Sequence, residues 1–276
     1  MTEESDSAVQ KWKIQVSSHH AQSIAAQENF DPSRDFWEGM TGGFIADPFR
    51  QNDLVLDRLL VEFSECQSVL DVGGGAGRFA LALSVHGKDI TVVDASQSML
   101  SELKKSCSSF KISEIKSVLS EWEQASVKTH DGVLCSHVAY GVEDIETFIN
   151  NIICHTNKHV VFLLFNQSPQ AHLAESWELV HKEKRINLPG ADELMPVLNE
   201  MGISPKFSVI QSLSIPIYES KDAALSDLRS RLYVNKGSVG EQKLKSSFDT
   251  LFAVNEEGFY LKNAPVKDLC IVQWRA

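Results

Sequence analysis

Two aspartates flank a glycine-rich segment, and their positions suit the binding of a nucleoside-like ligand. Asp71 lies two residues before the first glycine of the segment, in which residues 73–77 read Gly-Gly-Gly-Ala-Gly. Asp94 follows the apolar run 90–93. A carboxylate at the tip of a second strand lies beside such a loop and can accept hydrogen bonds from both hydroxyls of a ribose. Glycines there accept positive φ and let the backbone approach a ligand closely.

The glycine pattern alone leaves two cofactor classes open. A dinucleotide site requires G-x-G-x-x-G/A, which fails when read from Gly73 and passes when read from Gly75 to Ala80. Asp71 separates the classes better, because its charge would repel a pyrophosphate and would attract a cationic methionyl group. The sequence therefore favours a sulfonium ligand over a dinucleotide.

The elements around these residues form one recognisable unit. Residues 68–72 are a short apolar run of the kind expected for a buried strand, and residues 78–84 have helical character. With the strand at 90–93, the stretch from Cys66 to Leu100 predicts a βαβ unit that carries a nucleotide-type site.

Several motifs resemble those of class I S-adenosylmethionine-dependent methyltransferases, in the same order along the chain. Residues 71–77 resemble the D-x-G-x-G-x-G loop of that family, and residues 93–100 resemble its D-x-S-x-x-M-L segment. Glu121 and Trp122 stand where the family often places an acidic–aromatic pair near the adenine. Residues 131–138 resemble its fourth strand.

The resemblance implies an α/β, Rossmann-like, seven-stranded mixed sheet with an antiparallel last strand and helices on both faces. It implies S-adenosyl-L-methionine as cofactor, with S-adenosyl-L-homocysteine as product. The cofactor-binding residues carried over are Asp71, Gly73, Gly75, Gly77, Asp94, Ala95, Met99, Glu121, Trp122 and His137.

His137 and Tyr140 are the acid–base candidates, because they follow the predicted fourth strand, whose carboxyl end should face the ligand. A histidine that only bonds to backbone at the strand tip is an equally good interpretation of His137. Many relatives carry a histidine near the position of Gly141, and this chain does not.

We expect one methyltransferase domain over residues 1–276, with an N-terminal helical lid (1–50), a cofactor-binding core (51–165), and a cap insertion with the C-terminal strands (166–276). A predicted helix over residues 171–184 places the insertion after strand five, where acceptor specificity should be determined. Trp177 and His181 lie on it at i,i+4 spacing, which indicates either packing or a pocket wall. In the lid, packing is the simpler interpretation of Trp37, Met40 and Phe44.

Composition narrows the class of partner. The formal net charge is −11, which argues against a protein that grips nucleic-acid phosphates. No stretch is long and apolar enough to span a bilayer, and the acidic start lacks a signal-peptide pattern, so we expect a cytoplasmic protein with reduced cysteines. No metal-ligand motif and no G-x-S-x-G elbow occurs, and we expect no metal.

The predicted reaction is in-line methyl transfer to an unidentified small-molecule acceptor, for which the enzyme aligns the reactants and excludes water. Two alternatives remain from other classes: an NAD(P)-dependent oxidoreductase, and a non-catalytic subunit that binds S-adenosylmethionine. A tRNA or protein acceptor also remains open.

Overall fold

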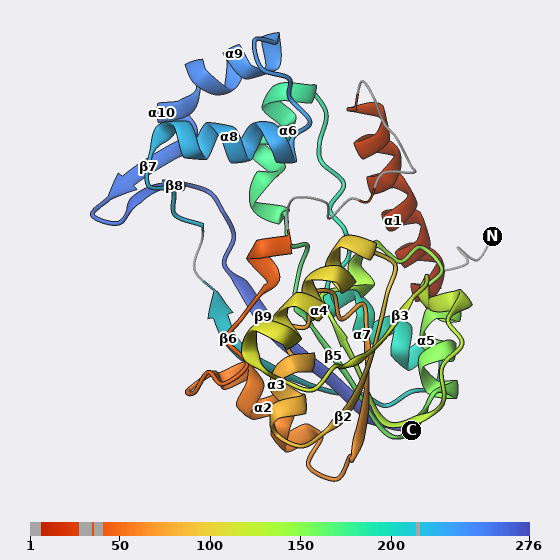
Figure 1. Cartoon of the computed structure of the whole chain (residues 1–276). Helices are drawn as coiled ribbons and strands as arrows, with labels where there is room; N and C mark the ends of the chain where they lie inside the picture. The colour runs from red at the N-terminus through yellow and green to blue at the C-terminus, as the bar shows by residue number, and fades with distance from the viewer. Residues whose placement is uncertain (1–6, 28–34, 36–40, 214–215) are drawn as a thin grey trace, which may run out of the picture.

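A seven-stranded sheet forms the centre of the protein (Figure 1). The computed structural model describes residues 7–27, 35, 41–213 and 216–276 of the chain. The strand order is β3-β2-β1-β4-β5-β9-β6, and β9 runs antiparallel to both of its neighbours. This confirms the predicted mixed sheet with an antiparallel last strand. The strands are β1 (Ser68–Val72), β2 (Asp89–Asp94), β3 (Lys116–Leu119), β4 (His130–Ser136), β5 (Thr156–Phe165), β6 (Lys206–Leu213) and β9 (Lys267–Arg275).

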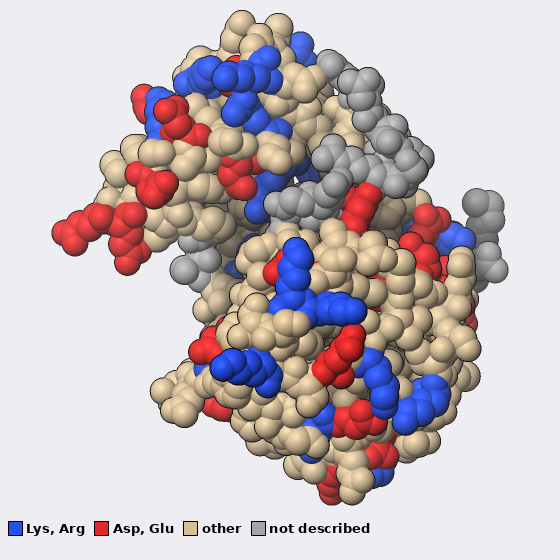
Figure 2. Space-filling view, in the orientation of Figure 1, with Lys and Arg blue, Asp and Glu red and all other residues tan. Residues whose placement is uncertain are grey.

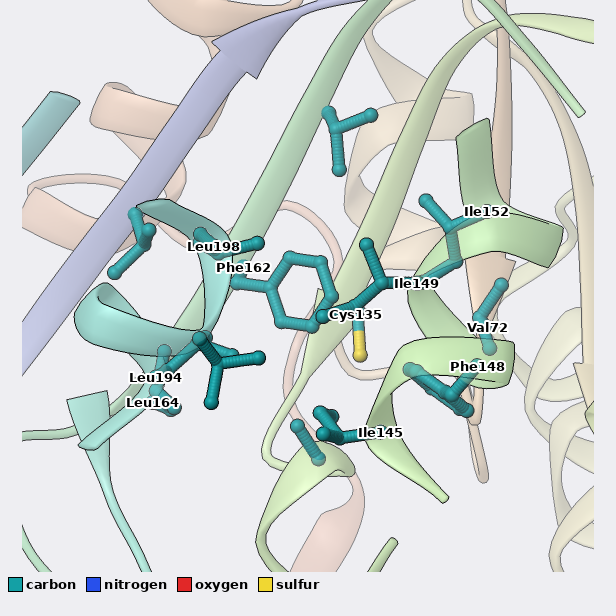
Figure 3. Close-up of a cluster of buried hydrophobic side chains, with 14 of the residues drawn as sticks. Val72, Cys135, Ile145, Phe148, Ile149, Ile152, Phe162, Leu164, Leu194 and Leu198 are labelled. Atoms are coloured by element: carbon teal, nitrogen blue, oxygen red, sulfur yellow. The ribbon is translucent and has the colours of Figure 1, made fainter. Parts of the chain in front are cut away.

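Helices cover both faces of this sheet, because the central strands are apolar on both sides. In β1, Val69 packs toward one face while Leu70 and Val72 pack toward the other. The first face is covered by α2 (Leu54–Glu62), α3 (Ala80–Val85) and α4 (Gln97–Phe110). The second is covered by α1 (Ala8–Ala25), α5 (Ile145–Cys154) and α7 (Ala191–Glu200). Buried side chains of α5 and α7 lie around Phe162 (Figure 3).

Helix α1 belongs to this second layer, although residues 1–50 were predicted to form a lid. Trp12 and Val16 are fully buried against the sheet-covering helices. The indole N–H of Trp12 donates to the carbonyl of Val142 at 2.8 Å. Trp37 and Met40 lie outside the described residues, and Phe44 is partly exposed in the short helix η1 (Thr41–Phe44). Helix α1 therefore packs on the layer that covers the sheet, and a lid role for residues 1–50 stays a prediction.

A cap with its own apolar core lies beyond one edge of the sheet (Figure 1). The helix predicted after strand five is η4 (Ala171–Leu173) followed by α6 (Ala174–His181). A second and larger segment, inserted between β6 and β9, completes the cap with α8 (Lys221–Arg231), α9 (Val239–Ser246), α10 (Phe248–Leu251), β7 (Phe252–Asn255) and β8 (Gly258–Leu261). Trp177 is buried in the cap core, and His181 Nε2 lies 2.9 Å from the carbonyl oxygen of Leu232. Both side chains therefore pack inside the cap.

The carboxyl ends of the parallel strands face the cap, and we call this side of the sheet the ligand edge. Residues from most of the strands lie there. The parallel strands contribute their last residues, such as Asp94 and Phe165. Strand β9 contributes its first residue, Lys267, because it runs the other way and pairs there with the end of β6. Ligands of open α/β sheets bind at this edge. No helix among the described residues is both long and apolar enough to cross a membrane.

Candidate active site

The glycine loop after β1 packs closely against β2 and against the residues that follow β4. The backbone N–H of Gly73 still donates to Val93 of β2, at 2.7 Å. Gly73, Gly75 and Gly77 all have positive φ, between 53° and 86°. A Cβ at Gly73 would collide with Val138, and one at Gly77 would collide with Leu103. Backbone conformation therefore favours glycine at all three positions, and packing adds to this at Gly73 and Gly77.

Asp94 ties this loop to the start of α4. One of its carboxylate oxygens accepts the N–H of Gly75 and the other accepts the N–H of Ser96, each at 2.8 Å. Burial raises the pKa of Asp94 despite these two hydrogen bonds. Because a carboxylate offers about four acceptor positions, free positions remain for ribose hydroxyls. Ala95 is exposed beside it, and the Met99 thioether packs at the position of Gly75.

Asp71 is a buried carboxyl whose hydrogen-bonding capacity is incompletely satisfied. Its side chain is buried, at 2% exposure, and its Oδ1 has no hydrogen-bond partner among the described residues. Burial raises the pKa of Asp71 to about 8, and the charge of Asp94 adds to that effect. Gly74 lies directly over this carboxyl, where a Cβ would be 2.7 Å from Oδ2. An unpartnered buried carboxyl in this position fits a cationic group on the ligand.

Glu121 lies on the surface, whereas its neighbour Trp122 is buried in the core. Trp122, in the short helix η2 (Trp122–Gln124), is 7% exposed and donates its indole N–H to Phe148 at 3.2 Å. Its ring packs edge-on against His155 at 5.3 Å. Glu121 is exposed after the end of β3. The described contacts of Trp122 are those of a core side chain, and a role of either residue beside adenine stays a prediction.

His137 and Tyr140 are in direct contact at the end of β4. His137 has φ +59°, and its Nδ1 lies 3.0 Å from the Tyr140 hydroxyl. The same hydroxyl accepts the backbone N–H of Phe165 at 2.5 Å. Tyr140 lies in the short helix η3 (Ala139–Gly141) and is buried, which raises its pKa far above the usual range. A backbone-bonded ring was one of two interpretations of His137, and the described contact of its Nδ1 is instead to the Tyr140 side chain, while an acid–base role stays a prediction.

The hydrogen bonds of Tyr140 indicate which atom donates and which accepts between His137 and Tyr140. The Tyr140 oxygen already accepts from Phe165, and His137 Nδ1 is the one acceptor within reach of the Tyr140 proton among the described contacts, so we assign that proton to this bond. His137 Nδ1 is then unprotonated, and the ring proton is on Nε2. His137 keeps exposed surface, but its ring packs against the rings of Tyr140 and Phe165. Desolvation of the ring lowers its pKa to about 4, and the positive charges of Arg78 and then Lys267 act in the same direction. At neutral pH His137 is uncharged and offers an N–H donor to the cleft.

Three residues at this edge were missed by the sequence analysis. Asp35 accepts hydrogen bonds from the Ser96 and Ser98 hydroxyls and from the Ser98 N–H, at 2.7–3.1 Å, and so joins the N-terminal region to the start of α4. Lys267 and His172 lie on the cap side of the edge. None of them falls in a recognisable motif, because each reaches the site through tertiary packing.

Comparisons with known proteins find matches to the sequence and to the fold. The methyltransferase domain family matches residues 44–204, more than half of the chain. The ubiquinone biosynthesis O-methyltransferase of Rickettsia canadensis (strain McKiel) is 25% identical over 156 residues, which cover 53% of this chain and 65% of that protein. The chain spans about half the length of the curated relatives it matches.

Two solved structures show the same fold. Protein BH2331 of Bacillus halodurans C-125 has a TM-score of 0.54 at 14% identity, over 82% of this chain and 99% of its own. The plantazolicin methyltransferase BamL, solved in complex with a triazolic desmethylPZN analog and SAH, has a TM-score of 0.51 at 16% identity. That alignment covers 95% of this chain and 98% of BamL.

Proposed function

The chain belongs to the methyltransferase domain family, and we propose that it transfers a methyl group from S-adenosylmethionine to a small-molecule acceptor. The observation that carries the proposal is the buried Asp71 carboxyl, whose Oδ1 has no partner among the described residues. S-adenosylmethionine has the two chemical features that this edge suits: a positively charged methionyl part for Asp71 and a ribose for Asp94. Bound there, it supplies a methyl group on a cationic sulfur.

The chain's own residues then act by binding and orientation. Asp71 neutralises positive charge in a site where water is scarce, and Asp94 holds both the glycine loop and the ribose hydroxyls. Methyl transfer is an in-line displacement, for which alignment of donor and acceptor provides most of the catalytic effect. The cap is placed over the same edge, where it excludes water from the reacting groups (Figure 1).

His137 is suited to bind the methyl acceptor by a hydrogen bond, and less suited to act as the base that removes the proton of the acceptor. Its Nδ1 is occupied by Tyr140, and its Nε2 carries the proton. Tyr140 keeps its own proton at neutral pH, because burial raises its pKa. An acceptor that is already a nucleophile, such as an anion or a thiolate, requires no base, and this arrangement favours one. The net charge of −11 argues against a nucleic-acid acceptor.

Calorimetric titration tests the donor assignment. We expect S-adenosylmethionine and S-adenosylhomocysteine to bind, and NADH not to bind. Asp94→Ala should weaken binding about 100-fold, through loss of hydrogen bonds to a charged acceptor worth about 1.5–3 kcal/mol each. Asp89→Ala is the matched control, because Asp89 lies at the opposite, exposed end of the same strand.

The alternatives predict different results in the same assay. Selective binding of NADH would replace the methyltransferase assignment with an oxidoreductase. Tight binding of S-adenosylmethionine without methyl transfer to any acceptor in a screen with labelled donor would indicate a binding subunit.

A further inference from the structure

Lys267 is a half-buried cation at the cap side of the ligand edge. Its Nζ donates to the carbonyl of Pro169 at 2.7 Å and lies 5.0 Å from the centre of the Phe165 ring. Among the described residues, no carboxylate lies within 4.0 Å of this ammonium group. Burial lowers the pKa of Lys267, and the positive charge of Arg231 lowers it further. A cation that is desolvated without a counter-charge is stabilised by an anionic ligand.

His172 is a second buried polar group beside Lys267. It is 8% exposed, and its Nδ1 has no hydrogen-bond partner in the described part of the chain. Burial lowers the pKa of His172 to about 4, and the charges of Lys267 and Arg231 contribute in the same direction, while the charge of Asp227 and a hydrogen bond to the backbone of Pro169 oppose them. The ring is therefore neutral and can donate a hydrogen bond from one nitrogen. Buried polar atoms without a partner are rare, and a bound ligand is one explanation for such an atom.

This region continues to the point at which the methyl group would be delivered. The Phe165 ring that contacts Lys267 also packs against the His137 ring, with centroids 4.7 Å apart. Arg78 and Lys267 both lower the pKa of His137 by their positive charge. Positive side chains therefore lie on both sides of His137, with Arg78 at the glycine loop and Lys267 next to the cap.

Positive side chains gather beside Lys267 and His172, although the chain has a net charge of −11 and the carboxyls of Asp71 and Asp94 lie at the same ends of the strands. Arg78, Arg231 and Lys267 contribute three positive charges, whereas Asp227 is the one carboxylate that raises the pKa of His172. Asp227 is engaged by the Arg231 guanidinium at 2.8 Å and by the Tyr218 hydroxyl at 2.7 Å. Lys and Arg side chains are visible at the seam between cap and core (Figure 2).

We propose that the methyl acceptor carries a carboxylate group, which Lys267 and His172 bind between the cap and the sheet. This inference rests on the proposed function and specifies its substrate class. One ammonium and one imidazole donor match the charge and size of a carboxylate, since Arg231 is already held by Asp227. An acceptor with an ammonium group in this position would be repelled by Lys267 and Arg231.

Paired probes that differ only in charge test the proposal. The protein is first saturated with S-adenosylhomocysteine, and that binding is measured by itself. Benzoate, octanoate and phenylacetate are then titrated calorimetrically, each beside its neutral carboxamide and beside phenyl phosphate. We expect at least one carboxylate to bind ten-fold or more tightly than its amide.

Substitutions separate the carboxylate site from general effects of charge. Lys267→Gln should abolish the preference for the carboxylate while leaving the affinity for S-adenosylhomocysteine unchanged. Lys236→Gln removes an exposed lysine of the same cap and should retain the preference. His172→Asn keeps a neutral hydrogen-bond donor and should lose only part of the preference for the carboxylate over the amide.

The other outcomes overturn the proposal. Equal binding of all carboxylates and amides, or a preference that survives Lys267→Gln, would contradict it. A preference for phenyl phosphate would assign the cleft to a phosphorylated acceptor. Failure of S-adenosylhomocysteine to bind would instead contradict the proposed function, which the first titration shows separately.

Discussion

The Tyr140 hydroxyl donates its proton to His137 Nδ1 across 3.0 Å while it accepts the backbone N–H of Phe165. The pair therefore links the end of β4 to the end of β5 at the site where an acceptor would lie. It also fixes the His137 tautomer, since the alternative would leave the Tyr140 proton without an acceptor among the described residues.

Tyr140→Phe should change His137 without removing it. Loss of the hydroxyl removes a hydrogen bond that stabilises the neutral ring, so the pKa of His137 should rise above about 4, while burial and the charges of Arg78 and Lys267 keep it below its ordinary value of 6.5. The unpaired Phe165 N–H should cost about 1–3 kcal/mol of stability. Nitrogen NMR of labelled histidine reports both the tautomer and the titration. An Nδ1-protonated ring in the unaltered protein would contradict the assignment.

Asp71→Asn should stabilise the ligand-free protein at neutral pH. The pKa of this carboxyl is raised from 3.8 to about 8 by folding, so the folded state binds more protons than the unfolded state between these values. The penalty therefore grows as pH rises from about 4 to about 8 and then stays constant. The increase in Tm on substitution should be large at pH 8 and small at pH 4.

The control for this substitution is Asp249→Asn, which removes a fully exposed carboxylate of the cap. Its Tm should change little at either pH. A loss of stability in Asp71→Asn at pH 8 would show that the carboxyl has a favourable partner in the free protein.

The affinity for S-adenosylmethionine should increase with pH up to about 8. In the empty site Asp71 is protonated below that value, and a cationic ligand binds the carboxylate, so binding releases a proton. The loss of affinity should approach about ten-fold per pH unit below the pKa. Calorimetry in two buffers of different ionisation enthalpy measures the released proton. Comparison with Asp71→Asn removes the contribution of the ligand's own titration, and equal pH slopes would contradict the prediction.

Trp122→Phe should separate packing from cofactor contact. Because Trp122 is buried and bonds to Phe148, its replacement should lower the free energy of unfolding by about 2 kcal/mol. The affinity for S-adenosylhomocysteine should stay within about two-fold of the unaltered value. Glu121→Gln is the companion variant, since Glu121 is the exposed member of the pair. A ten-fold loss of affinity in Trp122→Phe with unchanged stability would place the indole at the adenine.

The fold and the cofactor edge were predictable because they depend on short-range signals. The apolar run at 68–72, the glycines at 73–77 and the acid at Asp94 are local in sequence, and their pairing in a parallel sheet follows from general rules. The helix at 171–184 was located correctly, but its extent was overestimated, since α6 ends at His181 and Lys182 has φ +61°.

The acceptor side could not be predicted, because its residues come together only in three dimensions. Lys267 is one lysine among many in the sequence, and only the antiparallel direction of β9 brings it to the ligand edge. His172 lies at the start of a cap helix whose core partners are 50 to 90 residues away. Asp35 shows no local signal, because its partners Ser96 and Ser98 belong to a different element.

The contrast between the glycine loop and Asp71 has an evolutionary consequence. Gly73 and Gly77 are required by the packing of Val138 and Leu103, so a descendant that lost its cofactor would still need them. The buried Asp71 carboxyl weakens the empty protein, so drift toward asparagine would be favoured once binding no longer mattered. Retention of the acid, rather than of the glycines, is therefore the mark by which active lineages can be separated from inactive ones.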